Sequence, residues 1–383
     1  MPASRRVSST APERERGAKQ APSLELPAAS GYRMPAEWEP HAATWLAWPH
    51  EASDFPGKLP AIHWVFCEIA RHLTAAERVR LIVRDASMQK VASAALAKSG
   101  VDLDAVDFMR AATNRSWTRD FVPSFVVREA ATSAKARGGV AAVKFRFNGW
   151  ARYPNHSKDE ETGRKVAEFL GIGAFEPSAP SERRTTRVVL EGGAIDVDGE
   201  GTLLATEECL LDGKQARNPR LGREGTEAVL RDYLGIEHVV WIGRGVAGDD
   251  TGGHIDDFAR FVGPATVVLC EEPRKGDANH KVLESARERL ERARDARGRR
   301  IEVVRLPMPE PVYFDGQRLP ASYANFYICN ACVIVPTFND VNDRAALGIL
   351  GELFKDRPVV GIHAVDLVLG FGSLHCLTQQ EPA

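Results

Sequence analysis

The chain has 383 residues, of which 44% are hydrophobic and 27% are charged, the composition of an ordinary globular protein. Its formal net charge of −2 provides no global field that would draw it to nucleic acid or to an anionic membrane. No apolar run approaches the roughly 20 residues that span a bilayer. We therefore expect neither a nucleic-acid partner nor a membrane partner.

Residues 1–30 are rich in Ala, Pro, Ser and mixed charge and contain no apolar segment. This composition predicts a disordered N-terminal tail rather than a secretory signal. The Arg5-Arg6 pair is not followed by the hydrophobic stretch of a twin-arginine signal. The chain is therefore expected to be cytoplasmic, with its catalytic domain over residues 31–383.

Six cysteines are scattered along the chain, which indicates reduced thiols in a cytoplasmic enzyme rather than a disulfide framework. Cys329 and Cys332 form a C-x-x-C inside an apolar, strand-like run. No second such pair and no nearby histidine completes a zinc site. Packing of small buried thiols in the core is therefore favoured over metal or redox chemistry at these two positions.

Hydrophobic periodicity alternates between helix-like and strand-like segments along the body of the chain. In chain order we expect a helix over 62–73, strands over 79–83 and 140–147, helices over 164–170 and 281–297, a strand over 301–306, a helix over 345–354 and a strand over 359–362. Acidic residues interleave the many arginines of the 281–297 helix, which favours a solvated face over a nucleic-acid surface. No linker divides the chain after Gly31, so the pattern predicts a single α/β domain.

Cys376 is the strongest candidate for a nucleophile, because it lies in a loop of glycines and polar residues over 370–380. Glycine allows a backbone to approach a ligand closely. A thiol attacks as a thiolate, and its ordinary pKa of about 8.5 requires a neighbouring base or cation. The sequence must therefore supply such a partner elsewhere.

His254 is the candidate acid and base, and it follows Gly252 and Gly253. If His254 opens a strand, it projects on the same face as Asp256, because side chains alternate along a strand. Asp257 would then point to the opposite face, and Asp250 would stay in the preceding loop.

Asp120 and Glu191 are carboxylates beside apolar runs, where an ionised group needs a cationic partner. Several carboxylates, a thiol and an imidazole suit a planar guanidinium, which carboxylates bind bidentately while the thiolate attacks its central carbon. Each signal also has a structural interpretation. His-x-Asp arises by chance, Glu-Gly-Gly is commonly a turn, and Asp120 can pair with a structural arginine. The residues alone indicate a cysteine hydrolase or transferase for a cationic substrate.

The chain also resembles the agmatine deiminases and the related bacterial peptidylarginine deiminase-like proteins over most of its length, from about residue 31 to residue 381. The motifs that carry the resemblance follow one another in the family's order. They are Met34–His41 with Thr44–Pro49, Trp117–Asp120, Leu190–Gly193, Thr206–Leu210 with Arg217–Pro219, Gly253–Asp256, Tyr323–Ile328 with Ile334–Pro336, and His375-Cys376 with Thr378–Gln380.

The resemblance implies a pentein fold, a five-fold pseudo-symmetric α/β propeller with its active site on the central axis. The intervals from Asp120 to Glu191 and from Glu191 to His254 are 71 and 63 residues, and the interval from His254 to Cys376 is 122, or twice 61, which is consistent with repeats of roughly 60 to 70 residues. The resemblance also implies no metal and no organic cofactor. The sequence is compatible with a homo-oligomer.

By the same resemblance, Cys376 attacks the guanidinium carbon and forms a covalent thiouronium intermediate. His254 protonates the departing ammonia and then activates water. Asp120 and Asp256 clamp the guanidinium nitrogens, and Glu191 faces the pocket and aids His254 or the substrate. Trp117 and Gly253 are the further expected substrate contacts. The implied reaction converts agmatine to N-carbamoylputrescine and ammonia, in putrescine biosynthesis.

Three positions depart from the family pattern. Phe121 follows Asp120 where Thr is common, Gly252 stands where many members have Asp, and Phe371 stands in a loop that is usually Gly-Gly-Gly-Asn-Ile-His-Cys. These departures concern the part of the pocket that would contact the far end of the substrate. The alternatives are a deiminase of another guanidino compound, such as free or peptidyl arginine, and a pentein that binds without catalysis.

Overall fold

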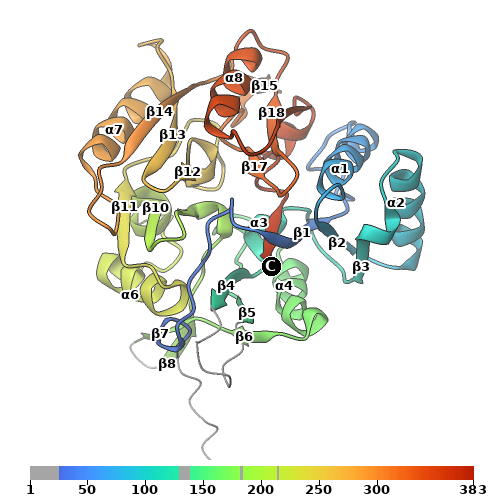
Figure 1. Cartoon of the computed structure of the whole chain (residues 1–383), viewed down its shortest axis with the longest axis horizontal. Helices are drawn as coiled ribbons and strands as arrows, with labels where there is room; N and C mark the ends of the chain where they lie inside the picture. The colour runs from blue at the N-terminus through green and yellow to red at the C-terminus, as the bar shows by residue number, and fades with distance from the viewer. Residues whose placement is uncertain (1–25, 129–138, 182–183, 214) are drawn as a thin grey trace, which may run out of the picture.

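The computed structural model describes residues 26–128, 139–181, 184–213 and 215–383 (Figure 1). Residues 1–25 of the predicted N-terminal tail lie outside the described residues, and Ala28–Ser30 form a short 3-10 helix, η1. None of the helices in the described part of the chain has the length and apolar character that crossing a membrane requires.

Five sheets in the described residues share one pattern, in which a first strand is antiparallel to a second and the second is parallel to a third. The first strands are β4 (Ser124–Arg128), β9 (Ile195–Val197), β12 (Ala259–Gly263), β17 (Tyr327–Ile328) and β20 (Gln379–Pro382). The second strands are β5 (Gly139–Val143), β10 (Thr202–Thr206), β13 (Thr266–Glu271), β18 (Val333–Thr337) and β1 (His41–Ala47). The third strands are β6 (Gly173–Phe175), β11 (His238–Ile242), β14 (Glu302–Pro307), β19 (Val359–His363) and β2 (Arg78–Val83).

Parallel neighbours in a sheet need a crossover, and helices supply it between the second and third strands. These helices are α1 (Leu59–Leu73), α4 (Ser157–Leu170), α6 (Gly222–Leu234), α7 (Ala278–Arg292) and α8 (Asp343–Leu353). Two more are α5 (Glu207–Leu211), before α6, and α2 (Ala86–Lys98), which leads to the additional parallel strand β3 (Val106–Arg110) beside β2. The remaining elements are the hairpins β7 (Ser178–Ser181) with β8 (Arg184–Arg187) and β15 (Tyr313–Phe314) with β16 (Gln317–Arg318), and the 3-10 helices η2 (Leu103–Ala105) and η5 (Leu367–Gly370).

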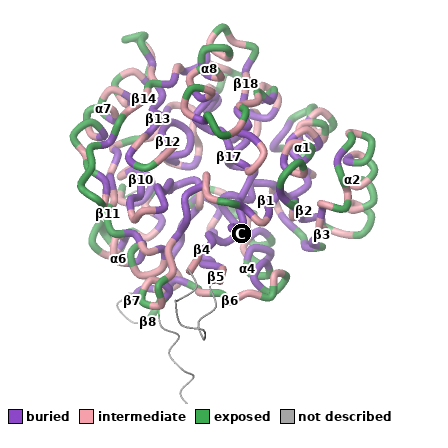
Figure 2. Tube along the Cα trace, viewed as in Figure 1, coloured by how far each residue is buried: buried purple, intermediate pink, exposed green. Residues whose placement is uncertain are grey.

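The crossover helices lie on the outside of the molecule and the sheets lie inside them (Figure 1). Helix α1 shows the reason, since Ile62, Phe66, Ile69 and Leu73 recur at helical spacing and are buried. Buried residues accordingly concentrate toward the middle of the molecule, and exposed residues follow the outer helices (Figure 2). The described residues therefore form a mixed α/β fold, as the sequence predicts.

Most of the predicted elements are confirmed, with shifted ends. Helix α4 begins seven residues before the predicted start. Its first turn is polar, so the spacing of apolar residues gives no sign of a helix there. Strand β5 ends at Val143, where Lys144 turns inward and its Nζ donates to Glu160 Oε2 (2.8 Å). Helix α7 ends at Arg292 rather than at residue 297, because Asp295 forms a turn by accepting the backbone N–H groups of Arg297 and Arg299.

The segments that precede the first strands meet in the middle of the molecule. Helix α3 (Thr118–Phe121) precedes β4, η3 (Gly192–Ala194) precedes β9 and η4 (Ile255–Asp257) precedes β12. Elements η3 and η4 contact each other, and α3 contacts η3. The chain returns to this place in β20, which pairs with β1 at the centre of the view (Figure 1). Each candidate site residue lies on one of these segments.

Candidate active site

The loop that carries Cys376 is fixed by one side chain, that of Asn325. Asn325 Oδ1 accepts the Ser373 hydroxyl (2.8 Å) and the backbone N–H groups of His375 (3.1 Å) and Cys376 (3.4 Å). Asn325 Nδ2 donates to Cys376 Sγ (3.2 Å). Asn325 lies just before strand β17, and Cys376 lies just before strand β20. The segment that leads into β17 therefore fixes the loop that leads into β20.

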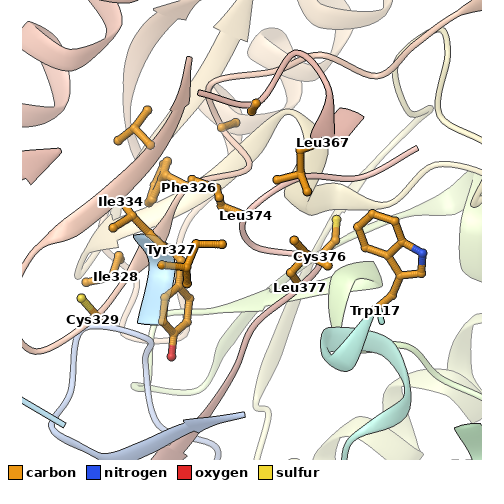
Figure 3. Close-up of a cluster of buried hydrophobic side chains, with 14 of the residues drawn as sticks. Trp117, Phe326, Tyr327, Ile328, Cys329, Ile334, Leu367, Leu374, Cys376 and Leu377 are labelled. Carbon is orange, nitrogen blue, oxygen red and sulfur yellow. The ribbon is translucent and has the colours of Figure 1, made fainter. Parts of the chain in front are cut away.

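Cys376 lies between an apolar cluster and the pocket. Leu374 and Leu377 belong to the buried cluster that includes Phe326, and the Trp117 indole lies on the other side of the thiol (Figure 3). The Cys376 side chain is 7% exposed, and its S–H donates to Asp256 Oδ2 at 3.6 Å. Burial and the neighbouring Asp256, Asp257 and Asp120 raise the Cys376 pKa well above its usual value. Without a bound cation the group is a thiol.

His254 lies among three carboxylates. Its Nδ1 is 4.0 Å from Asp120 Oδ1 and 3.9 Å from Asp256 Oδ1, and its Nε2 is 3.8 Å from Glu191 Oε2. Burial lowers the His254 pKa, but these three carboxylates outweigh burial and raise it to about 9. His254 is therefore an imidazolium at neutral pH and can donate a proton.

Asp120 accepts hydrogen bonds from two neighbouring segments. Its Oδ2 accepts Trp150 Nε1–H (2.7 Å) and its Oδ1 accepts the Gly193 backbone N–H (3.0 Å). Burial, opposed by His254 and reinforced by the Asp256 and Glu191 charges, raises the Asp120 pKa to about 6. A Cβ at Gly193 would lie 2.6 Å from His254 Nδ1 and 3.0 Å from the carboxylates of Asp120 and Asp256, so the site leaves room for glycine alone.

Glu191 is held by Arg217, whose Nε donates to both carboxylate oxygens (2.9 and 3.0 Å). Burial opposes ionisation of Glu191, but Arg217 and His254 outweigh burial and keep the Glu191 pKa below its usual value. Glu191 is thus an ionised group that faces His254, but it does not line the pocket that the sequence analysis expects it to face.

Asp256 lies beside Cys376 and has a second histidine as its partner. His375 lies between two carboxylates, with Nδ1 2.7 Å from Asp256 Oδ2 and Nε2 2.8 Å from Glu37 Oε2. Burial opposes ionisation of Asp256, but His375 and then His254 outweigh burial and lower the Asp256 pKa. Asp256 Oδ1 and His254 Nε2 are buried and have no hydrogen-bond partner among the described residues. The hydrogen-bonding capacity of these two atoms is therefore unused among the described residues.

The predicted strand geometry at His254 is wrong. Residues 255–257 form the 3-10 helix η4, and β12 begins at Ala259. In this turn Asp257 does not point away from Asp256. Its ligand oxygen lies within 4.8 Å of those of Asp256 and Cys376, and it accepts Asn325 Nδ2 (3.1 Å). Burial and the Asp256 charge raise the Asp257 pKa well above its usual value.

Gly253, expected to contact the substrate, holds the loop before His254. Its φ of +102° suits glycine, its N–H donates to Asp249 Oδ2 (2.6 Å) and its carbonyl accepts the Thr206 hydroxyl (2.5 Å). A side chain at Gly252 would collide with Gln215 Oε1, at 2.0 Å from its Cβ. The space that an aspartate would need at this departure from the family pattern is therefore filled here by Gln215.

A pocket of about 260 Å³ opens onto Cys376, Asp120 and Trp117. Phe371 also lines this pocket, with a φ of +66° that is unusual for a non-glycine residue. Phe121 does not line the pocket. It is 1% exposed and its ring packs near Phe147, with ring centroids 6.5 Å apart. Of the two phenylalanine departures, Phe371 therefore alters the pocket and Phe121 alters the core behind it.

Two further acidic residues and one basic residue also line this pocket. Asp54, Arg115, Tyr153 and Asp250 line it. Arg115 forms an ion pair with Asp54 and lies over the Tyr153 ring, with Cζ 4.7 Å from the ring centroid. The Tyr153 hydroxyl donates to Asp250 Oδ2. Burial raises the Asp54 pKa to about 6 and also raises that of Asp250. With Asp120, three carboxylates therefore line this pocket, against Arg115 in its lining and Arg152 over the Tyr153 ring (5.7 Å from Cζ to the centroid).

Two groups of potential metal ligands overlap the site, and both are already engaged. Glu191, Cys209 and His254 form one, but Arg217 places a positive charge on Glu191. Asp256, Asp257 and Cys376 form the other, in which Asp256 bonds His375.

Sequence reasoning did not assign four side chains of the site: Glu37, Trp150, Asn325 and His375. Glu37, Asn325 and His375 lie inside motifs of the family resemblance, and that was the signal available for them. Asn325 also precedes a first strand, as Asp120, Glu191, His254 and Cys376 do. Trp150 lies in a loop with φ +58° and carries no local signal.

All six cysteines are buried and free. Cys329 and Cys332 lie in the turn between β17 and β18 with their sulfurs 3.5 Å apart, and they are 0% and 2% exposed, which confirms the predicted core packing.

Comparison with known proteins places the chain among guanidine-modifying enzymes. The family model described as Porphyromonas-type peptidyl-arginine deiminase matches residues 33–382. The chain is 34% identical to an agmatine deiminase of Ectopseudomonas mendocina (strain ymp), over 93% of this chain and 97% of the relative, and 36% identical to that of Stutzerimonas stutzeri (strain A1501), with the same coverage. A solved structure of the agmatine deiminase of Enterococcus faecalis matches with a TM-score of 0.82 and 30% identity, over 95% of this chain and 99% of that one. The chain therefore belongs to the Porphyromonas-type peptidyl-arginine deiminase family.

Proposed function

We propose that this protein hydrolyses agmatine to N-carbamoylputrescine and ammonia, and that Cys376 is its nucleophile. The observation that carries the proposal is a buried thiol and the Asp120 carboxylate at one pocket, with a histidine raised to a pKa of about 9 and the carboxylates of Asp256 and Glu191 directly behind them. The named relatives are agmatine deiminases, which fits this chemistry. The product would feed putrescine biosynthesis, in the cytoplasm.

The guanidinium binds between Asp120 and Asp256. A guanidinium presents N–H donors in a plane, and two carboxylates on opposite sides can accept them together. Asp256 Oδ1 has no other partner among the described residues. The Trp117 indole forms one wall of the pocket, and it is pressed against Gly370 and Gly372, where a Cβ would come within 3 Å of the ring.

Substrate binding prepares the nucleophile. Nearby carboxylates raise the Cys376 pKa in the free protein, so a bound cation offsets their field and favours the thiolate, with the thiol proton released to solvent. The thiolate then attacks the central guanidinium carbon and forms a C–S bond. The C–N bond to one NH2 group breaks, His254 supplies the proton for the departing ammonia, and a thiouronium intermediate remains on Cys376.

The second half of the reaction uses His254 in the opposite sense. His254, now neutral, takes a proton from water, and the hydroxide attacks the thiouronium carbon. The C–S bond breaks, the hydroxyl proton of the intermediate passes to the departing sulfur to restore the Cys376 thiol, and the product leaves as a neutral urea. Glu191 faces His254 Nε2 and stabilises its charged form, while Arg217 keeps Glu191 ionised.

The outer pocket favours an amine over an amino acid. The pocket lining carries the carboxylates of Asp54, Asp120 and Asp250, against Arg115, which pairs with Asp54, and Arg152, which lies over the Tyr153 ring (5.7 Å from Cζ to the centroid). An ammonium group at the far end of the substrate is attracted by this excess negative charge, whereas the carboxylate of arginine is repelled. Agmatine carries an ammonium there and no carboxylate.

We further propose that the five similar sheets are the repeats of a five-fold pseudo-symmetric pentein propeller. Their common strand pattern supports this arrangement. The position of Asp120, Glu191, His254, Asn325 and Cys376 before the first strands supports it as well. In such a propeller, each repeat supplies one group to the central axis.

The test is ammonia release from agmatine and from arginine, measured side by side with wild-type protein and Cys376→Ala. We expect turnover of agmatine, at least tenfold weaker turnover of arginine, and none with Cys376→Ala. Mass spectrometry of acid-quenched wild-type protein should show the thiouronium adduct, and Cys376→Ala should lack it. Cysteine-dependent turnover of arginine alone would overturn the substrate assignment. Agmatine turnover by Cys376→Ala would overturn the mechanism, and silence on a wider guanidine panel would favour a binding protein.

A further inference from the structure

Phe371 is an aromatic side chain that the mechanism does not use, although it lines the pocket together with Cys376 and Trp117. Its backbone φ of +66° lies in the left-handed region, where a Cβ is unfavourable and glycine is the usual residue. Of the six non-glycine residues with a positive φ in the described part of the chain, two are aromatic, Trp150 and Phe371, and both line this pocket. An unfavourable backbone that recurs at one pocket indicates that these side chains serve the pocket.

The two aromatic residues serve the pocket in different ways. Trp150 has a polar role, because its Nε1–H donates to Asp120 Oδ2 (2.7 Å). The Phe371 side chain has no polar atom, so it acts through its apolar surface and through the volume that it occupies. Phe371 is half-buried and packs against the main hydrophobic cluster of the protein, which leaves part of its ring open to the pocket.

The loop fixes the direction in which the Phe371 side chain leaves the backbone. The Phe371 N–H donates to the Val368 carbonyl (3.0 Å) at the end of η5. On either side, Gly370 and Gly372 lie against the Trp117 indole, where an added Cβ would come within 2.5 Å and 2.9 Å of ring carbons. The backbone therefore cannot shift toward the indole to relieve the unfavourable φ, and the ring of Phe371 stays in the pocket wall.

The pocket wall near Phe371 suits a short aliphatic chain. Trp117, Leu369 and Phe371 contribute apolar surface to the lining, while Asp120 offers a carboxylate to a guanidinium beside Cys376. The pocket volume of about 260 Å³ is below the range of about 300–1,000 Å³ that is typical for drug-sized ligands. A small guanidine with an unbranched arm matches this lining and this volume.

We propose that Phe371 is a specificity-determining residue, whose ring contacts the unbranched methylene arm of a guanidinoalkane and occupies the space that a branched or peptide-linked arm needs. The inference rests on the proposed function in that the guanidinium is taken to bind beside Cys376. Burial of one methylene group is worth about fourfold in affinity, so loss of contact with one or two of them costs about 4- to 15-fold. The arm does not react, so this contact is equal in the bound substrate and in the transition state, and it changes KM rather than kcat.

The first test measures binding without turnover. The probe is n-butylguanidine, which has the guanidinium and a four-carbon arm but no amine, and it is titrated by calorimetry into Cys376→Ala and into Cys376→Ala/Phe371→Gly. We expect Kd to rise by about 4- to 15-fold when the ring is removed. An equal Kd in the two proteins, or no binding to either, would overturn the proposal. Because the measurement needs neither agmatine nor catalysis, it separates this inference from the substrate assignment.

The second test compares the kinetics of agmatine with those of Nα-acetylarginine amide, a branched probe that resembles a peptide-linked arginine. In Phe371→Gly we expect KM for agmatine to rise by the same 4- to 15-fold, about as in the binding test, with kcat changed by less than about twofold. The ratio of kcat/KM for the branched probe to that for agmatine should rise by about tenfold or more. A fall in kcat with KM unchanged, or an unchanged ratio, would overturn the proposal. If wild-type protein turns over neither compound, the proposed function fails, and the calorimetric result decides this inference.

Ala265→Gly is the matched control for the backbone. Ala265 has a φ of +56° in the turn between β12 and β13 and does not line the pocket, so glycine there relieves a similar backbone cost at a distance. We expect both substrates to keep their wild-type KM in this variant, and Phe371→Gly to keep the wild-type Tm, because glycine suits the φ at residue 371. If Phe371→Gly does not fold, Phe371→Leu keeps an apolar side chain and removes the ring. Its KM for agmatine should rise by about threefold, and an unchanged KM would overturn the proposal.

Discussion

The pKa of His254 should fall when Asp120 is replaced by Asn. Asp120 Oδ1 lies 4.0 Å from His254 Nδ1 and is the largest of the three contributions that raise the His254 pKa to about 9. Two unit charges at this distance interact by about 4 kcal/mol at an effective dielectric constant of 20. At about 1.4 kcal/mol per pKa unit, this energy corresponds to about 3 units as an upper limit.

Asp256 and Glu191 remain at 3.9 and 3.8 Å in Asp120→Asn and continue to favour the imidazolium. We therefore expect the His254 pKa to fall by between about 1 and 3 units. The assay is an NMR titration of His254 in the substrate-free variant, which does not depend on activity. Asp54→Asn is the matched control, because Asp54 lines the same pocket but pairs with Arg115. A His254 pKa that stays near 9 in Asp120→Asn, or falls equally in Asp54→Asn, would refute this electrostatic account.

Three further predictions follow from the same site. The pH profile of kcat/KM for the wild-type protein should be bell-shaped. Protonation of Asp120 should give an acidic limb near pH 6, and loss of the His254 proton should give a basic limb near pH 9. A stopped assay of ammonia release across this pH range provides the measurement. Iodoacetamide should alkylate Cys376 in the substrate-free protein more slowly at pH 7.5 than it alkylates free cysteine, because burial and the nearby carboxylates raise the thiol pKa. Peptide mass spectrometry measures the labelling, and rapid labelling of Cys376 would contradict this prediction. Gly193→Ala should lower kcat/KM by about 10²-fold or more, since its Cβ would meet His254 Nδ1 at 2.6 Å, whereas Gly263→Ala, which meets no atom within 4 Å, should be close to wild type.

Much of the candidate site could be predicted from the sequence because its members are chemically unusual. Cys376 in a glycine loop, His254 beside Asp256, and acids next to apolar runs each require a partner, and the structure brings these residues together. The local geometry could not be predicted in the same way. The sequence after His254 does not distinguish a strand from a 3-10 turn, and this turn decides that Asp257 faces Asp256.

Partners that come from distant segments were also beyond sequence reasoning. Asn325 is 51 residues from Cys376 and holds its loop, and Trp150 is 30 residues from Asp120 and donates to it. Neither side chain belongs to a periodic pattern, and each acquires its role from tertiary packing alone. The same limit applies to Phe121, whose place behind the pocket depends on Phe147 rather than on its position next to Asp120.

The pairing of β1 with β20 has a consequence for folding kinetics. It joins segments separated by 336 residues, as in the bond from Trp45 Nε1 to Glu381 Oε2 (3.0 Å). Contacts across such a long loop carry a large entropic cost of closure, so they should form late. Until they form, Cys376 is an ordinary exposed thiol, open to oxidation and to mixed disulfides. Refolding in the presence of an oxidant should therefore damage the nucleophile far more readily than the same treatment of the native enzyme.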